Sequence, residues 1–269
     1  MKILLNNNDL NEALYSIRNL GFVPTMGSLH NGHKSLIKKS LRQCDKTIVS
    51  IFVNPTQFNN KNDYKKYPRN NKRDLSILRK LKVNYVYLPK KEQIYNLKNI
   101  TKPKLNKKEE ILCAKYRKGH FEGVIDVMRR LTMIVKPSKI FMGEKDFQQF
   151  LLVKKYIKKT SKAQIVCCKT IRAKNKLALS SRNLHLKKKD FELAANIIRN
   201  LTYFKKKLIK KNIKKLLLDK KKELNKLNHI NIEYLELRNK KNLKLSNSIK
   251  NSKLFLAFYI NKIRLIDNF

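Results

Sequence analysis

The feature that most constrains the fold is an alternation of short apolar runs with amphipathic stretches along the first two-thirds of the chain. The apolar runs are rich in β-branched and aromatic residues and occupy residues 21–24, 47–53, 83–88, 139–142 and 164–171. Helical periodicity lies between them, over residues 31–43, 71–81, 121–136 and 145–159. Strands that alternate with helices form a parallel sheet. We therefore predict an α/β domain with a Rossmann-like parallel sheet over residues 1–170.

The pattern changes near residue 170. Residues 187–228 are Lys-rich and helical, residues 230–237 alternate like a strand, and residues 254–266 indicate one or two further strands. We predict a second, smaller α+β domain over residues 171–269. Residues 90–118 are polar and weakly periodic, and we expect either an insertion or a mobile loop there.

The charge is strongly positive. Lys and Arg number 64 against 19 Asp and Glu, giving a formal net charge of +45, and 51 of the 64 are Lys spread along the whole chain. An AT-rich genome produces this composition without a polyanionic partner, and nucleic-acid binders more often use Arg. We predict no specific nucleic-acid partner. The alternative is a nucleic-acid-binding remnant of a synthetase, whose binding would fall steeply with salt.

Membrane and export signals are missing from the sequence pattern. The longest apolar runs, such as 254–260, fall far below the roughly 20 residues of a membrane span, and the first residues lack a signal-peptide pattern. The cysteines show no C-x-x-C spacing, which indicates reduced thiols and no zinc site. We expect a cytoplasmic protein with no membrane partner.

Residues 24–33, with the sequence PTMGSLHNGH, carry the clearest chemical signal. A short strand leads into a glycine-containing turn and then into a helix. Backbone N–H groups at Gly27, Gly32 and the helix start are then placed to meet phosphate oxygens. His30 and His33 lie on the same side of the turn and can donate to a triphosphate as pyrophosphate leaves. The segment predicts a site for a nucleoside triphosphate.

H-x-G-H after a first strand is similar to the mark of the nucleotidyltransferase superfamily, the adenylate-forming relatives of the class I aminoacyl-tRNA synthetases. Over nearly its whole length, the chain resembles the pantoate–β-alanine ligase (pantothenate synthetase) family. The resemblance rests on PTMGSLHNGHKSL, FVNPTQF (52–58), DYKKYPRNNKRDL (63–75), KGHFEGV with GEKDFQQ (118–149) and TIRAKNKLALSSRN (170–183).

This resemblance implies an ATP-dependent ligase that condenses (R)-pantoate with β-alanine through pantoyl adenylate, releasing AMP and pyrophosphate. It also implies Mg²⁺ with ATP as co-substrate, no tightly bound cofactor, a homodimer, and a C-terminal domain that acts as a lid. Another nucleotidyltransferase, acting on a phosphate-bearing acceptor, is the nearer alternative, but it would need basic contacts where this chain has Gln57 and Gln149.

The site residues follow from the blocks. Gln57 lies beyond the carboxyl end of a predicted strand, and its amide suits a hydroxyl and a carboxylate. The resemblance assigns Gln57 and Gln149 to pantoate and Gln57 also to β-alanine. It assigns catalysis to His30, His33, Lys145 and Arg182, with no protein ligand to a metal. The expected ATP contacts are Met26, Gly27, Ser28, Leu29, His30, Asn31, Gly32, His33, Gly143, Glu144, Lys145, Asp146, Ile171, Leu179, Ser180, Ser181 and Arg182.

Two positions depart from the family pattern. Asn175-Lys176 replaces the usual Asp-Gly before LALSSRN, so the turn loses its glycine, and Lys118 replaces a proline before Gly-His-Phe. Both changes bear on loop closure and rate rather than on substrate contacts. Asp74 follows YPR near a predicted helix start, where an Asp is typically a cap, and we give it no role in the site.

Overall fold

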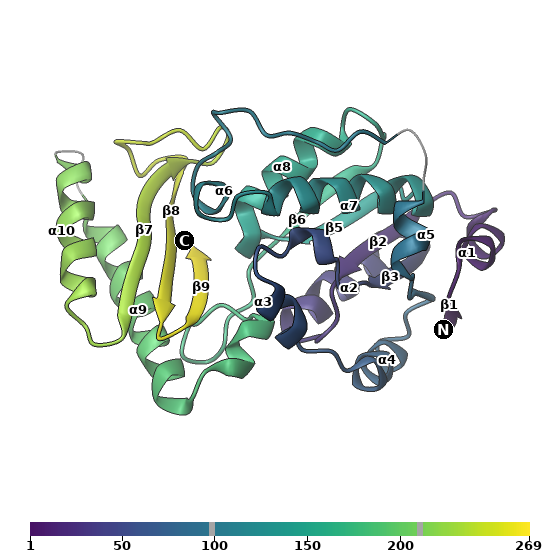
Figure 1. The fold of residues 1–269 in the computed structure, drawn as a ribbon, viewed down its shortest axis with the longest axis horizontal. Helices are drawn as coiled ribbons and strands as arrows, with labels where there is room; N and C mark the ends of the chain where they lie inside the picture. The colour runs from purple at the N-terminus through teal and green to yellow at the C-terminus, as the bar shows by residue number, and fades with distance from the viewer. Residues whose placement is uncertain (97–99, 209–211) are drawn as a thin grey trace. The chain divides into compact units, whose positions relative to one another are not determined.

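A computed structural model of the chain describes residues 1–96, 100–208 and 212–269, which form two compact units, Met1–Lys169 and Thr170–Phe269. The first unit contains a parallel six-stranded sheet with the order β1-β4-β3-β2-β5-β6 (Figure 1). Its strands are β1 Lys2–Leu4, β2 Leu20–Thr25, β3 Lys46–Ile51, β4 Tyr85–Tyr87, β5 Lys139–Gly143 and β6 Gln164–Cys168. The predicted Rossmann-like fold class is confirmed.

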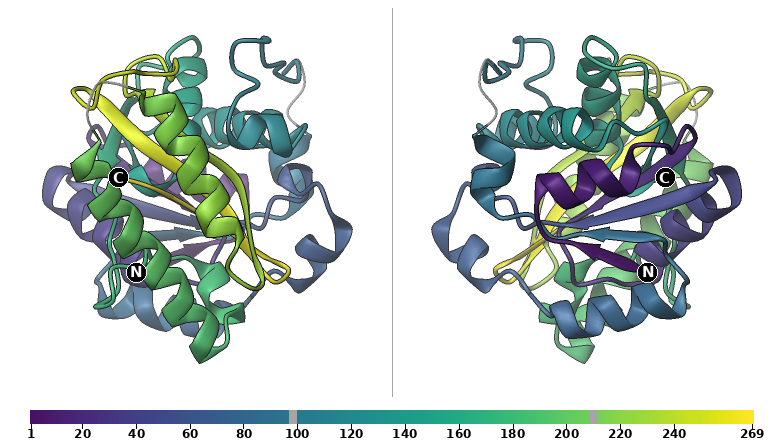
Figure 2. Two further views of the ribbon diagram at one scale, coloured as in Figure 1. Left: turned by 90° about the vertical axis from the view of Figure 1, so that its left-hand side faces the viewer. Right: turned by 90° about the vertical axis from the view of Figure 1, so that its right-hand side faces the viewer.

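Helices cover both faces of this sheet. On one face, apolar side chains of α2 (Asn31–Gln43) and α4 (Asn71–Lys80) pack with strand residues such as Val23 and Val49. The other face carries α1 (Asn7–Leu14), α7 (His120–Val135) and α8 (Phe147–Ile157), and the right-hand view of Figure 2 shows α1 and α7 across the strands from α4. Burial on both faces explains why the strands read as continuous apolar runs.

The order of the strands reverses direction at β2. The chain passes from β2 outward to β3 and β4, then returns to the opposite side of β2 as β5. Pairing of β2 with β5 ends at Phe22 and Ile140, and Pro24, two residues farther, has no N–H to continue that ladder. Ligands of open α/β sheets bind at such a switch point, outside the carboxyl ends of the strands.

The second unit is built on an antiparallel sheet with the order β7-β8-β9. Its strands are β7 Ile230–Asn239, β8 Ser252–Ile260 and β9 Ile263–Asn268, and its helices are α9 Lys188–Lys207, α10 Ile213–Asn225 and the short η3 Ser181–His185. Apolar residues of α9, α10 and the sheet form one core. Arg172 pairs through two nitrogens with the carboxylate of Asp267 on β9, which ties the start of this unit to the sheet. The predicted smaller α+β domain is confirmed.

Several elements differ from the expectations. The chain has an additional three-residue strand, β1, and two additional short helices in its first 70 residues, α1 and α3 (Lys61–Lys66), all too short to leave a periodic signal. The helical stretch predicted over 187–228 is two helices, α9 and α10, and residues 209–211 of that stretch lie outside the described residues.

The segment predicted as an insertion or a mobile loop is anchored to the first unit, apart from residues 97–99, which lie outside the described part. It includes two short helices, α5 (Lys91–Tyr95) and α6 (Cys113–Tyr116). Side chains of α8 fix the stretch between them: Gln148 donates to the Ile111 carbonyl at 2.7 Å, and Lys155 pairs with Glu109 at 2.6 Å. Across 1–96, 100–208 and 212–269, no helix is both long and apolar enough for a bilayer span.

Candidate active site

Three loops follow the carboxyl ends of β3, β2 and β5, three neighbouring strands of the sheet. The loop after β2 carries Met26–Leu29 and leads into α2, the loop after β3 forms a 3-10 turn η1 (Pro55–Gln57), and β5 leads into a second turn η2 (Glu144–Asp146). Carboxyl ends of neighbouring parallel strands lie at one edge of a sheet. The predicted ATP and pantoate groups of the first unit therefore share one edge.

A buried carboxylate holds the loop after β2. The two oxygens of Asp74, on α4, accept from the backbone N–H of Ser28 at 2.7 Å and of Leu29 at 2.8 Å, and Asp74 is only 1% exposed. Gly27 has φ +79 and Ser28 has φ +52, both in the left-handed region. A side chain at Gly27 would be strained by this φ and would place its Cβ 2.9 Å from Asp74 Oδ2. The carboxylate therefore stabilises an unusual turn.

Side chains of the protein accept from further amides of this loop and of the start of α2. Besides the two amides bound to Asp74, the Gly27 N–H donates to Thr25 Oγ1 at 3.2 Å and the Gly32 N–H donates to His30 Nδ1 at 3.1 Å. Two of the amides predicted to meet phosphate, those of Gly27 and Gly32, thus donate to side-chain acceptors of the protein in this structure.

His30 and His33 form a defined pair at the start of α2. His30 is the N-cap, its Nδ1 accepting from the Gly32 N–H, and His33 Nδ1 accepts from the His30 N–H at 3.3 Å. A neutral imidazole whose Nδ1 accepts carries its proton on Nε2. The rings lie with centroids 4.1 Å apart. Both rings therefore hold Nε2–H donors at the same helix terminus.

Electrostatics keep this pair neutral. Burial, with the positive charge of Lys145 adding to it, lowers the pKa of His30 to about 4. Burial, the neighbouring His30 and Lys145 lower the pKa of His33 to about 3. At neutral pH the histidines are therefore uncharged donors, and Lys145 supplies the positive charge beside them.

The GEKDFQQ segment follows β5. Gly143 is the last residue of β5, and Glu144, Lys145 and Asp146 make up η2, where Lys145 Nζ lies 3.5 Å from Asp146 Oδ1. Gln149 is half-buried in the first turn of α8. The Lys145 ammonium carries three N–H donors and no acceptor, which suits an anionic oxygen.

Gln57 ends η1 and contacts the loop after β2. Its Nε2 lies 2.8 Å from Met26 Sδ, and its Oε1 accepts from Asn54 Nδ2 at 3.2 Å. The structure thus brings the predicted pantoate residue against a predicted ATP residue. Asn54 was missed by the sequence reasoning, although its place before Pro55 in FVNPTQF is the signal that marks it.

The segment with Lys118 in place of proline is fixed by other contacts. His120 Nε2 lies 2.8 Å from Arg117 Nη1, which only donates, so His120 Nδ1–H donates to the Gln57 carbonyl at 2.7 Å. Asn59 Nδ2 donates to the Lys118 carbonyl. These bonds order the backbone beside Gln57 without the proline ring.

The remaining predicted residues belong to the second unit. The Leu179 N–H donates to the Ile171 carbonyl at 3.0 Å, closing a hairpin-like turn, and Ser180 Oγ caps η3 by accepting from the Arg182 N–H at 3.2 Å. Ser181 and Arg182 are half-buried at the start of η3. At the tip of the turn Lys176 has φ +76, the conformation that a glycine adopts without strain.

No cluster of three or more His, Cys, Asp or Glu side chains suited to a metal ion occurs within the part of the chain that the structure describes.

Comparisons with known proteins identify the family of the chain. The family described as Pantoate-beta-alanine ligase matches residues 2–269. A pantothenate synthetase of Francisella tularensis subsp. novicida is 42% identical, covering 96% of this chain and 94% of the relative, and one of Azobacteroides pseudotrichonymphae is 40% identical, covering 100% and 99%.

Solved structures give the same answer. The pantothenate synthetase of Thermus thermophilus matches with TM-score 0.92 at 30% identity, covering 100% of this chain and 99% of that one. The pantoate-beta-alanine ligase of Francisella tularensis, in complex with β-γ ATP and β-alanine, matches with TM-score 0.84 at 40% identity, covering 100% and 97%. The predicted resemblance is confirmed, and the chain belongs to the pantoate-β-alanine ligase family.

Proposed function

We propose that this chain condenses (R)-pantoate with β-alanine in two steps, using MgATP and passing through pantoyl adenylate. The observation that carries the proposal is the neutral His30–His33 pair, whose Nε2–H donors lie with Lys145 at the switch point of the sheet. Gln57, in the neighbouring loop, supplies the polar group for the acid.

In the first step, the pantoate carboxylate attacks the α-phosphorus of ATP, and the bond from that phosphorus to the bridging oxygen breaks. Negative charge accumulates on the departing pyrophosphate. The imidazole N–H groups and the Lys145 ammonium are placed to stabilise that charge. Because the acceptor is charged, hydrogen bonds from these neutral N–H groups are charge-assisted and stronger than neutral–neutral ones.

In the second step, the β-alanine amine attacks the acyl carbon of the adenylate, and AMP leaves with the electrons of the acyl–oxygen bond. The amine loses a proton to solvent. The protein contributes mainly position, since both reacting groups must be held within contact distance. We assign Gln57 and Gln149 to pantoate, and Gln57 also to β-alanine.

Further parts of the proposal rest on family membership alone. They are the ATP contacts of Ile171, Leu179, Ser180, Ser181 and Arg182, the catalytic role of Arg182, the division of labour between residues 1–170 and 171–269, the homodimer and the cytoplasmic location. Light scattering of the purified protein tests the homodimer.

The test of the function is a product assay. Purified protein is incubated with ATP, Mg²⁺, pantoate and β-alanine, and AMP and pantothenate are quantified. We expect equal amounts of the two products, and neither when either acid is omitted. A protein that releases AMP but forms no amide with β-alanine is a different adenylate-forming enzyme, and the proposal is then wrong.

A further inference from the structure

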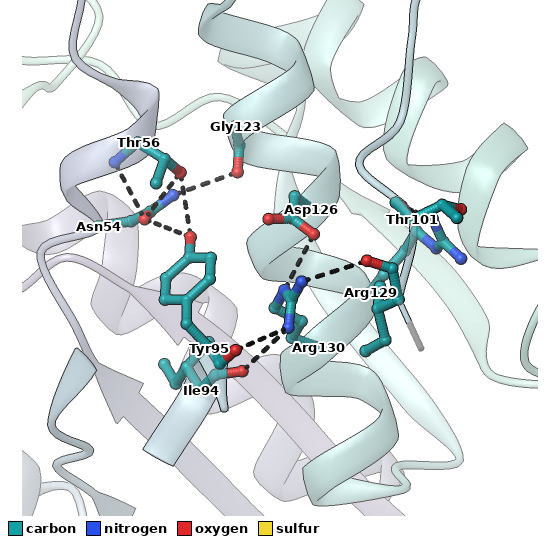
Figure 3. Close-up of polar contacts among 10 residues, drawn as sticks. Asn54, Thr56, Ile94, Tyr95, Thr101, Gly123, Asp126, Arg129 and Arg130 are labelled. Carbon is teal, nitrogen blue, oxygen red and sulfur yellow. Dashed lines mark hydrogen bonds and ion pairs between the residues drawn. The ribbon is translucent and has the colours of Figure 1, made fainter. Parts of the chain in front are cut away.

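Asn54, buried between β3 and η1, is a branch point of hydrogen bonds (Figure 3). Its Oδ1 accepts from the Thr56 backbone N–H at 3.3 Å, and its Nδ2 donates to the Gly123 carbonyl at 3.1 Å. A backbone N–H only donates and a carbonyl only accepts, so these two groups fix which end of the amide is oxygen. Asn54 therefore has one orientation.

That orientation is passed to Gln57. Because Asn54 Nδ2 is a donor, the group 3.2 Å from it must be the oxygen of Gln57, and the Gln57 NH₂ group takes the other end, beside Met26 Sδ. A thioether sulfur is a weak acceptor. Asn54 therefore fixes which end of the Gln57 amide carries the N–H donors: the NH₂ group faces the loop after β2, where it can donate to a substrate oxygen.

The hydroxyl of Tyr95, at the end of α5, completes the arrangement. It donates to Asn54 Oδ1 at 2.7 Å, the shortest of the contacts to that oxygen, and lies 3.0 Å from Thr56 Oγ1. Burial raises the pKa of Tyr95, so the phenol keeps its proton and remains a donor.

Helix α7 holds Tyr95 in place. The Arg130 guanidinium lies over the Tyr95 ring, 5.0 Å from its centroid, and its Nη1 lies 3.4 Å from the Tyr95 carbonyl oxygen (Figure 3). Arg130 in turn pairs with Asp126 at 2.9 Å, and both are buried. Gly123 on the same helix packs directly on η1: a Cβ at this position would lie 2.3 Å from the backbone carbonyl oxygen of Thr56. The helix thus supports both ends of the chain of hydrogen bonds.

We propose that Tyr95 is a positioning residue of the pantoate site, acting through Asn54 to fix the Gln57 amide with its N–H donors toward the oxygens of the acid. The inference rests on the proposed function, which makes pantoate the ligand of Gln57. It assigns to Tyr95 an effect on the affinity of one substrate, transmitted over two side chains.

The test is Tyr95→Phe, which removes only the hydroxyl and keeps the ring under Arg130. Tyr87→Phe is the matched control, because the Tyr87 hydroxyl is also bonded to an asparagine side chain, that of Asn7 and not of Asn54. We expect the KM for pantoate to rise about 3- to 10-fold in Tyr95→Phe, as for one lost hydrogen bond. The KM for ATP should be unchanged, and Tyr87→Phe should leave both values as in the wild type.

A second variant keeps the test decisive if Tyr95→Phe does not fold. Thr56→Val removes the hydroxyl 3.1 Å from Asn54 Oδ1, and it should also raise the KM for pantoate selectively. The positioning role is overturned if both KM values rise together, or if Tyr95→Phe matches Tyr87→Phe. A wild-type protein that forms no pantothenate overturns the proposed function instead, so the two failures are distinct.

Discussion

Replacing Asp74 by Asn tests the most consequential contact of the nucleotide loop. The carboxylate accepts two backbone N–H groups at 2.7 and 2.8 Å in a position that is 1% exposed. Asn offers one oxygen, so one charge-assisted bond is lost, about 1.5–3 kcal/mol, and the other becomes a neutral bond that is weaker by about 1 kcal/mol. We expect Asp74→Asn to lower the free energy of unfolding of the first unit by about 2.5–4 kcal/mol.

Urea unfolding followed by circular dichroism measures this loss, and amide hydrogen exchange of the Ser28–Leu29 segment locates it. Asp9→Asn is the control, because the Asp9 carboxylate binds no backbone amide of the nucleotide loop: it accepts from Asn6 Nδ2 at 2.9 Å and adds a favourable charge to the first turn of α1, about 0.3–1 kcal/mol. The pyrophosphate exchange rate should fall in Asp74→Asn and not in Asp9→Asn. Equal losses of stability in the two variants, with unchanged exchange at Ser28, would refute the reasoning.

Three further predictions concern charge, specificity and backbone. Because the pKa values of His30 and His33 are lowered to about 4 and about 3, the unfolded chain binds protons below pH 6.5 that the folded chain does not. Stability should therefore fall as the pH drops from 6.5 toward 4, by at most about 2 kcal/mol per histidine at pH 5, and His33→Ala should flatten this slope and cut adenylation about 10²–10³-fold. By calorimetric titration, Gln149→Leu should weaken pantoate and spare ATP while Lys145→Ala does the reverse; equal losses for both ligands would contradict the assignment. Lys176→Gly should raise the free energy of unfolding of the second unit by about 0.5–1 kcal/mol because φ is +76, whereas Lys174→Gly should not.

Local sequence predicts the parts of the site that lie close together in the chain. The helix predicted over residues 31–43 has the same bounds as α2. Its apolar residues recur with helical periodicity, and the turn before it ends at the N-cap His30. The carboxyl ends of β2, β3 and β5 were predictable from the apolar runs that precede each loop.

Contacts between distant residues left no signal. Asp74 binds amides 45 and 46 residues away, and a bond to a backbone N–H requires no particular partner residue. Tyr95 lies in a segment without periodicity, 41 residues from Asn54, so its role appears only when α7 packs on η1. For the same reason, the sequence does not reveal that Asp74 and His30 accept from backbone amides of the loop after β2 and the start of α2.

Isotope exchange between labelled pyrophosphate and ATP tests the central claim most directly, that the pantoate carboxylate is activated as an adenylate. The wild-type protein is supplied with MgATP, labelled pyrophosphate and one acid at a time. The two-step chemistry predicts label in ATP with pantoate alone and none with β-alanine alone. Exchange with β-alanine alone would contradict the account. So would the absence of exchange with either acid in a protein that still forms pantothenate from both.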